Sequence, residues 1–176
     1  MNTIFGVVES AGPVDRELPD KMFGAVVLTT HSSVITRSTP NAFLGCCICD
    51  SSPVFHGQGA NGSLIAWDGR IDNRAELLNL LDCDASAMIS DSELALRAYE
   101  KWDRDFPAQI IGDFAFALWD PSVQALFCGR DPFGIRPFYY ALKGTKLFFS
   151  SQSWPLVAAT GEGPTVDLEY VADFLS

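Results

Sequence analysis

Two carboxylates in the middle of the chain are candidate site residues, and each also has a structural explanation. Asp68 is followed by Gly69, and because both residue types tolerate a positive φ, the pair predicts a tight hairpin turn. The turn would join strands at Leu64–Trp67 and Ile71. Asp91 lies in the first turn of a predicted helix, where the positive end of the helix dipole favours a carboxylate. Turn and helix chemistry alone account for both residues, so neither identifies a site by itself.

The cysteines are candidates for metal or redox chemistry, since three of the five stand together in Cys46-Cys47-Ile48-Cys49. A zinc site usually combines two short Cys or His clusters, and the sequence has no second cluster. Cys46 and Cys47 would also lie on opposite faces of a strand and share no ligand face. We therefore expect small buried hydrophobic side chains here and no metal site.

A dense run of special residues follows a predicted strand in the second half of the chain, Gly129-Arg130-Asp131-Pro132-Phe133-Gly134-Ile135-Arg136-Pro137. Two glycines and two prolines restrict the backbone to one path, so the run predicts a rigid loop. An Arg–Asp pair would stabilise that loop. The run lacks both the P-loop pattern and the Rossmann glycine spacing, so it is a poor phosphate cradle.

The elements that must position these residues can be located from apolar patterns and turn signals. The strand candidates are Ile4–Val8, Ala25–Thr30, Val34–Arg37, Ala42–Cys49, Phe114–Trp119, Ala125–Cys128, Pro137–Ala141 and Lys146–Phe149. One helix is expected to start at Asn73, three residues before Glu76, and another at the capping box Ser90-Asp91-Ser92-Glu93. Strands, then two helices, then strands indicate an α+β fold with antiparallel pairing rather than a Rossmann alternation.

The last residues carry a helical pattern that has no closing signal. Apolar residues recur at helical spacing at Leu168, Val171, Ala172 and Leu175. The pattern predicts a helix from about Asp167, and neither Gly, Pro nor a basic residue closes it before Ser176. We therefore expect residues 1–164 to form one domain, and residues 165–176 to begin a helix that leads into a further C-terminal domain.

Composition excludes several classes of function. The 176 residues contain 12 basic and 22 acidic side chains, so the formal net charge is −10, and the sequence pI is near 4.4. Nucleic-acid binding needs clustered Lys and Arg, and an acidic surface gains nothing at an anionic membrane. The apolar run after Met1 is too short for a signal peptide or a membrane span. The odd number of cysteines fits a reducing compartment, so we expect a soluble cytoplasmic domain.

Several of these segments resemble asparagine synthetase motifs, in one order and at similar spacing. Leu64–Leu77 resembles the strand–loop–helix that carries Asn-Gly-Glu-Ile-Tyr-Asn in that family, and Ser90–Glu93 resembles its acidic helix start. Gly112–Asp120 resembles its Gly-Met-Phe-Ala-Phe-Ala strand, and Gly129–Tyr140 its Arg-Asp-x-x-Gly-x-x-Pro-x-Tyr-Tyr run. The resemblance implies a class II glutamine amidotransferase domain, which is a four-layer αββα sandwich of two antiparallel sheets of the N-terminal-nucleophile hydrolase type.

The resemblance also implies a mechanism and a partner. In active family members a cysteine becomes residue one and attacks the side-chain amide of glutamine, with its own α-amine as a suitable base. An Asn side chain and a Gly N–H form the oxyanion hole, while an Arg and an Asp hold the substrate. The ammonia passes to a C-terminal synthetase domain of the same polypeptide, which uses ATP and magnesium. No cofactor is implied for the present residues, and a homodimer is a further option.

The sequence departs from the family at the reactive positions. Asn2 stands at the nucleophile position, and a carboxamide cannot replace a thiolate. Asp68 stands at the position of the oxyanion-hole Asn, and an ionised carboxylate donates no hydrogen bond. The strand that holds an Arg in the family reads Cys46, Cys47 and Ile48 here. Gly69 stands at the second oxyanion-hole position, and Asp91 and Gly69 match the family as a vestigial substrate-binding site. Because Asn2 and Asp68 replace the reactive residues, we expect no intact catalytic set.

Three hypotheses about function follow. The first is a degenerate amidotransferase domain that has lost glutaminase activity and is a scaffold for an asparagine synthetase-type carbon–nitrogen ligase. That ligase would form an amide or lactam with ATP, as in the similar lasso-peptide cyclases and β-lactam synthetases. The second is a binding module for an amine-bearing ligand, held near Asp91, or for a partner protein. The third is an active glutamine-hydrolysing asparagine synthetase that becomes competent after unusual N-terminal processing. Thr3 would then be the N-terminal residue.

Overall fold

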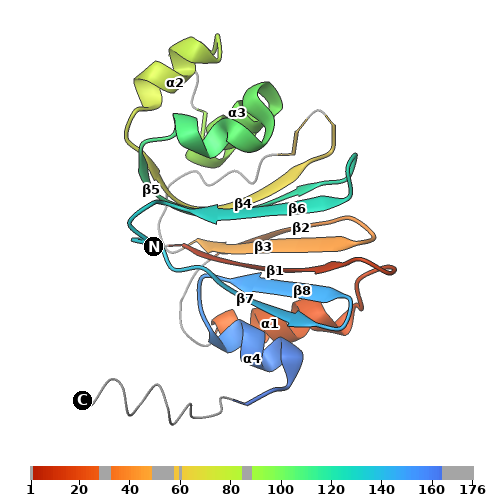
Figure 1. Cartoon of the computed structure of the whole chain (residues 1–176). Coiled ribbons are helices and arrows are strands. Elements are labelled where there is room, and N and C mark those ends of the chain that lie inside the picture. The colour runs from red at the N-terminus through yellow and green to blue at the C-terminus, as the bar shows by residue number, and fades with distance from the viewer. Residues whose placement is uncertain (1, 28–32, 49–57, 60, 85–88, 164–176) are drawn as a thin grey trace, which may run out of the picture.

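Two antiparallel sheets lie face to face, and helices cover both outer faces, in a computed structural model that describes residues 2–27, 33–48, 58–59, 61–84 and 89–163 (Figure 1). The five-stranded sheet has the order β2 (Ser33–Ser38), β3 (Ala42–Ile48), β1 (Thr3–Glu9), β8 (Lys146–Ser150), β7 (Tyr139–Lys143). The three-stranded sheet has the order β4 (Leu64–Ile71), β5 (Gly112–Asp120), β6 (Ala125–Arg130). The helices are α1 (Glu17–Val27), α2 (Arg74–Leu80), α3 (Asp91–Trp102) and α4 (Trp154–Thr160), with a 3₁₀ helix η1 (Asp103–Gln109) after α3. The expected α+β, four-layer αββα sandwich is confirmed.

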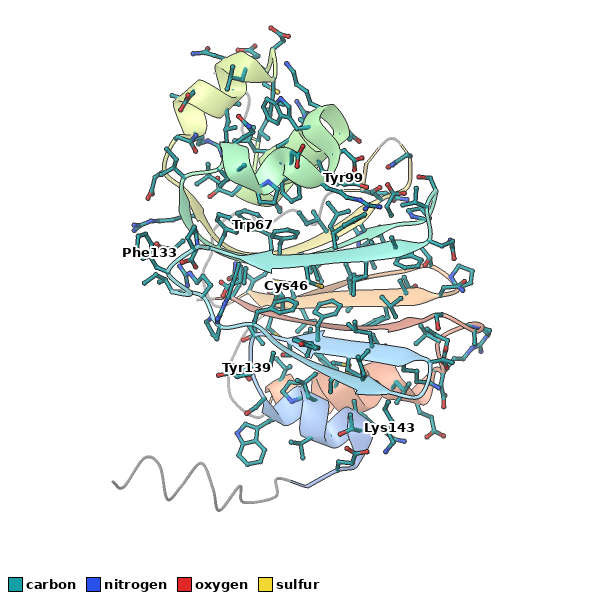
Figure 2. All side chains as sticks on the ribbon, viewed as in Figure 1. Cys46, Trp67, Tyr99, Phe133, Tyr139 and Lys143 are labelled. Carbon is teal, nitrogen blue, oxygen red and sulfur yellow. The ribbon has the colours of Figure 1, made fainter. Side chains whose placement is uncertain are left out.

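Three apolar layers hold the sandwich together. The inter-sheet core consists of Ile4, Val8, Ala42, Leu44, Cys46, Leu64, Ala66, Ala115, Ala117, Trp119 and Phe149. A second layer packs the three-stranded sheet against α2 and α3, and a third packs the five-stranded sheet against α1 and α4. In Figure 2, Cys46 points between the sheets, whereas Trp67 points towards α3. Alternate residues of each strand therefore enter different layers, as the period of two requires.

The central strand β1 confirms the strand predicted at Ile4–Val8. It pairs with β3 on one side and β8 on the other, so its backbone groups are hydrogen-bonded on both edges. Ile4 and Val8 face the inter-sheet core, while Phe5 and Val7 face α1. A strand that is buried on both faces needs an uninterrupted apolar run, which is why this segment could be recognised in the sequence.

The strand predicted at Ala25–Thr30 is wrong over its described part. Residues 25–27 end helix α1, which the sequence analysis missed, and residues 28–30 lie outside the described part. Leu18, Met22 and Val26 recur every four residues and are all buried against the five-stranded sheet. Val26 continues the buried face of the helix that starts with Leu18. The apolar residues near it therefore belong to an amphipathic helix and not to a strand.

The hairpin predicted at Asp68-Gly69 is also wrong. Strand β4 continues through both residues and pairs with β5 from Leu64–Trp119 to Ile71–Gly112. Gly69 has φ +154°, and a Cβ added there would lie 2.2 Å from the carbonyl oxygen of Asp113. Glycine is therefore required by the close approach of two strands and not by a turn.

The two predicted helix starts differ in how they are capped. Ser90 caps α3 as expected, since its Oγ accepts the N–H of Glu93 at 3.2 Å. Asn73 stands before α2 but does not cap it; its Oδ1 accepts the N–H of Ile111 at 2.9 Å, close to the start of β5. The predicted helix from Asp167, and the expected domain end at residue 164, lie outside the described residues.

The rigid loop predicted at Gly129–Pro137 is organised by one buried carboxylate. Asp131 accepts the backbone N–H groups of Phe133, Ile135 and Arg136, each at 3.1 Å, rather than pairing with an arginine of its own loop. Burial by itself raises the pKa of Asp131, but the N–H groups of Ile135, Arg136 and Phe133 outweigh it and hold that pKa below its usual value. The loop is therefore rigid because its donors converge on one anion.

Replacing Asp131 by Asn tests this account. The variant loses the charge and one acceptor oxygen, and hydrogen bonds to a charged group contribute about 1.5–3 kcal/mol each, so we expect unfolding free energy to fall by about 2 kcal/mol or more near neutral pH. A lowered folded pKa gives stability that is present above the unfolded pKa and is lost as pH falls, so the difference should narrow at about pH 3. Urea unfolding followed by circular dichroism measures it.

The control for this variant is Asp105→Asn, since Asp105 is exposed in η1. We expect the control to change stability by less than about 0.5 kcal/mol. An Asp131→Asn effect as small as that of the control would contradict the assigned role of the carboxylate.

Candidate functional site

The sandwich brings Asn2 and Asp68 together from opposite sheets. Leu64, Ala66 and Asp68 share the face of β4 that points towards the five-stranded sheet, and Asp68 is only 1% exposed. Its Oδ1 accepts the backbone N–H of Asn2 at 3.0 Å. Asn2 immediately precedes β1, so the pairing of that strand fixes where residue 2 lies. The structure thus joins the two residues that the sequence analysis expects at the nucleophile and oxyanion-hole positions.

A third residue, Arg136, enters this site from the loop that Asp131 organises. One terminal nitrogen of its guanidinium lies 3.8 Å from Asp68 Oδ1, which makes an ion pair with little exposure on either side. The other carboxylate oxygen, Oδ2, and the Nε of Arg136 are buried and have no hydrogen-bond partner within the described residues. The charges are therefore partly compensated, but the hydrogen-bonding capacity of the pair is not filled.

The environment of Asp68 raises the pKa of its carboxyl group. Burial between the sheets has the largest effect, because it disfavours the charged form. The Arg136 guanidinium and the Asn2 N–H act in the opposite direction and do not cancel it. This is the reverse of Asp131, which receives three backbone donors and whose pKa is lowered. At Asp68, deep burial and few donors together raise the pKa, whereas at Asp131 several backbone donors outweigh burial.

The side chain of Asp91 connects the start of α3 to the end of β4. Its Oδ2 accepts the backbone N–H of Ile71 at 2.9 Å, and its Oδ1 lies 2.7 Å from the Arg74 guanidinium. The same guanidinium donates to the backbone carbonyl of Ile89. None of these contacts involves Asn2 or Asp68. Each carboxylate oxygen already has a donor, so the predicted substrate-binding residue has a structural role that the helix dipole alone did not describe.

The cysteine segment lies beside the start of β1. Cys47 pairs with Thr3 across the strands, and its side chain faces the α1 layer, while Cys46 enters the inter-sheet core. The prediction of opposite faces is confirmed. Ile48 ends β3, and Cys49 lies outside the described residues. Within the described part of the chain, no group of three His, Cys, Asp or Glu side chains could hold a metal ion.

Sequence reasoning did not identify the contacts of three residues near Asp68 and the start of β1. Arg136 was recognised only as part of a rigid loop, since nothing local indicates that it points at a residue of β4. Gln152 donates from Nε2 to the Thr3 hydroxyl at 3.0 Å, and the neighbouring Ser151 Oγ accepts the N–H of Ile4 at 3.0 Å. Ser151 and Gln152, directly after β8, therefore hold the first residues of β1 in place.

The chain belongs to the glutamine amidotransferase domain family, because a family profile with that description matches residues 49–158, more than half of its length. Within that family it is a class II domain of the asparagine synthetase type. It is 38% identical over 96 residues to Asparagine synthetase [glutamine-hydrolyzing] 3 of Bacillus subtilis (strain 168), covering 53% of this chain and 16% of the relative. Asparagine synthetase [glutamine-hydrolyzing] 1 of the same strain is 30% identical over 114 residues, covering 64% and 18%. The chain thus spans less than a fifth of these relatives.

Solved structures support the fold. Glutamine phosphoribosylpyrophosphate amidotransferase from B. subtilis, complexed with ADP and GMP, matches with a TM-score of 0.70 over 90% of this chain and 43% of its own, at 13% identity. Identity this low supports the architecture alone. In the described part of this chain, no helix has the length and apolar character needed to cross a membrane.

The raised pKa of Asp68 predicts how its replacement by Asn changes stability with pH. An acid whose folded pKa lies above its unfolded pKa costs stability as pH rises, because the folded state binds the proton more tightly. We therefore expect Asp68→Asn to gain stability relative to the wild type between about pH 4 and pH 7. Urea unfolding at several pH values measures the trend.

Asp105→Asn again provides the exposed control. The burial account of Asp68 would be wrong if its Asn variant lost stability relative to the wild type as pH rose over the same range.

Proposed function

We propose that this chain is an amidotransferase domain that has lost glutaminase activity and is a scaffold for the synthetase half of an ATP-dependent carbon–nitrogen ligase. The observation that carries the proposal is the hydrogen bond from the Asn2 N–H to Asp68 Oδ1 at 3.0 Å. The fold still brings residue 2 and residue 68 together, but neither side chain has the group that glutamine hydrolysis requires.

The nucleophile is the first missing group. Glutamine hydrolysis in this family needs a thiolate at residue 2, and the Asn2 carboxamide has no lone pair of comparable nucleophilicity. Thr3 does not offer a replacement, since it is 3% exposed, lies within β1 and accepts a hydrogen bond from Gln152 at 3.0 Å. Trimming to Thr3 would remove the residue whose N–H bonds to Asp68, so the hypothesis of N-terminal processing is not favoured.

The oxyanion donor is the second missing group. Asp68 uses Oδ1 to accept a hydrogen bond, and its ionised form would repel the negative charge that develops on the substrate oxygen. Loss of one oxyanion-hole donor lowers kcat by about 10²–10³ in other enzymes. The raised pKa increases the share of the neutral acid, which has an O–H donor, but residue 2 still offers no nucleophile to use it.

The binding-module hypothesis has less support. The charge of Asp91 is already balanced by Arg74, and each of its oxygens receives a donor, from Ile71 and from Arg74. Asp91 therefore has a reason to be present that involves no ligand.

A domain that releases no ammonia fits a synthetase whose substrate already contains the amine. We therefore propose that the parent protein forms an amide or lactam, and that ATP and magnesium bind in a C-terminal domain of the same polypeptide. The lengths of the relatives are compatible with such a domain, since this chain covers 16% and 18% of the two asparagine synthetases. The sequence resemblance to lasso-peptide cyclases and β-lactam synthetases supports this reaction class, and we propose that the parent protein performs the reaction in the cytoplasm.

The proposal predicts that the purified chain releases no ammonia from glutamine above the rate without protein. A coupled glutamate dehydrogenase assay measures the release, with a glutamine-hydrolysing asparagine synthetase as the positive control. Intact-mass spectrometry of the same sample establishes which residue is N-terminal. Glutamine-dependent ammonia release by a sample that begins at Met1 or Asn2 would overturn the proposal.

A further inference from the structure

β7 is the outermost strand of the five-stranded sheet, and its sequence does little to block pairing with a further strand. Among the described residues, no strand pairs with its outer edge (Figure 1). Proline, a bulge or a central charge usually protects such an edge. The register of β7 with β8 is continuous, the strand has no proline, and its one charged residue, Lys143, stands at its end. Its outer backbone groups are therefore available to another strand.

Large apolar side chains distinguish this edge from the other edges of the two sheets. Tyr139, Tyr140 and Leu142 are exposed at 47%, 68% and 70%. Within the described part of the chain, the other edge strands, β2, β4 and β6, have no exposed large apolar side chain. An apolar edge of this kind is typical of an interface and not of a surface that faces only water.

Two of these side chains lie on the inner face of the sheet. Tyr140 lies opposite Phe149 and Leu142 opposite Leu147, and residues directly opposite in an antiparallel pair share a face. Phe149 and Leu147 belong to or pack against the inter-sheet core, so the exposed pair extends this core beyond the three-stranded sheet. Leu142 also lines a pocket of about 380 Å³, together with Trp119 of that core. A partner strand on β7 would cover this opening.

The hairpin turn determines which backbone groups of β7 are free. A two-residue turn joins Lys143 to Lys146, so this flanking pair is of the hydrogen-bonded type. Hydrogen-bonded and non-hydrogen-bonded pairs alternate along an antiparallel ladder, so the backbone of Ala141 also bonds to β8. The N–H and C=O groups of Tyr140 and Leu142 therefore point to the free edge.

We propose that β7 pairs with β7 of a second copy of this chain, antiparallel and about a two-fold axis at Ala141. The two five-stranded sheets then form one continuous sheet. Tyr140 of each copy lies opposite Leu142 of the other, and their free backbone groups exchange hydrogen bonds. Ala141 faces its own counterpart in a non-hydrogen-bonded pair, where the Cα atoms approach to about 4.5 Å and a small side chain fits. The interface does not depend on whether the domain has lost glutaminase activity.

The charge pattern around β7 suits a second copy. Residues 132–161, which include β7, β8 and α4, contain no Asp or Glu, although the chain has 22. Two chains of net charge −10 would therefore meet where neither carries negative charge. In the proposed pair, Lys143 of one copy lies opposite Tyr139 of the other, so no like charges face each other. An ammonium group close to a tyrosine ring is itself favourable.

The concentration dependence of the molecular mass tests the association. The strand pair is smaller than the about 1,600 Å² interface of a stable complex, so we expect a reversible dimer in the micromolar range. Sedimentation equilibrium should show the mass rise from 19.2 kDa towards twice that value as the chain is concentrated. Leu142→Asp changes an exposed side chain at the centre of the pair, and we expect the dissociation constant to rise by about tenfold or more.

Ile111→Asp is the matched control, because Ile111 is 63% exposed and directly precedes β5 in the other sheet. It adds the same charge and should leave the association unchanged. A chain that stays monomeric at every concentration would overturn the proposal and leave the edge of β7 to another partner. Equal dissociation constants for the wild type and Leu142→Asp would also overturn it.

Engineered cysteines test the register of the pair. Ala141→Cys brings two Cα atoms to about 4.5 Å, within the range of a disulfide. Lys143→Cys is the control on the same strand, since its counterpart lies about 13 Å away along the pair. In Figure 2 the labelled Tyr139 and Lys143 mark the two ends of β7.

With an added mild oxidant, we expect a disulfide-linked dimer of Ala141→Cys on a non-reducing gel, and none of Lys143→Cys. The unaltered chain, treated in the same way, accounts for the native cysteines. Equal cross-linking of the two variants, or no cross-linking of Ala141→Cys, would contradict the proposed pairing.

Discussion

The burial of β1 on both faces and both edges is the constraint on which the rest of the structure depends. Its side chains contribute to the inter-sheet core and to the α1 layer, and its backbone is hydrogen-bonded to β3 and β8. Because the strand cannot slip without moving every side chain to the wrong face, the position of residue 2 is determined by packing. The other end of the same strand lies beside a pocket that Val8 and Glu9 help to line.

Two buried carboxylates, Asp131 and Asp68, differ in how well their negative charge is stabilised. Asp131 receives three backbone donors, which stabilise its ionised form and make its loop rigid. Asp68 receives one backbone donor and a guanidinium at 3.8 Å, which do not compensate for its burial. The first carboxylate therefore supports the structure that holds Arg136 beside the second. The contacts that hold Asn2, Asp68 and Arg136 together are therefore made within the fold itself and need no ligand.

Much of the fold could be predicted because burial in a layered sandwich leaves a local pattern. Eight of the strand predictions are confirmed within a few residues, and Ser90 caps its helix as expected. The two wrong predictions of secondary structure arose where one local sequence pattern is compatible with two structures. Asp68-Gly69 has turn chemistry, but its glycine serves a close approach between β4 and β5. The apolar residues at the end of α1 are typical of a strand. They lie in a helix because Leu18, Met22 and Val26 form one buried helical face.

By itself, the sequence determined the motifs that place the chain in its family and the absence of a cysteine at residue 2, since both are matters of residue identity. Only the tertiary structure decided that Asp68 accepts the N–H of Asn2, that Arg136 is its partner, and that Asp91 is held by Ile71 and Arg74. It also decided that the inter-sheet core opens beside Trp119. Periodicity encodes the type of an element, whereas contacts between residues 66 positions apart depend on how whole sheets pack against each other.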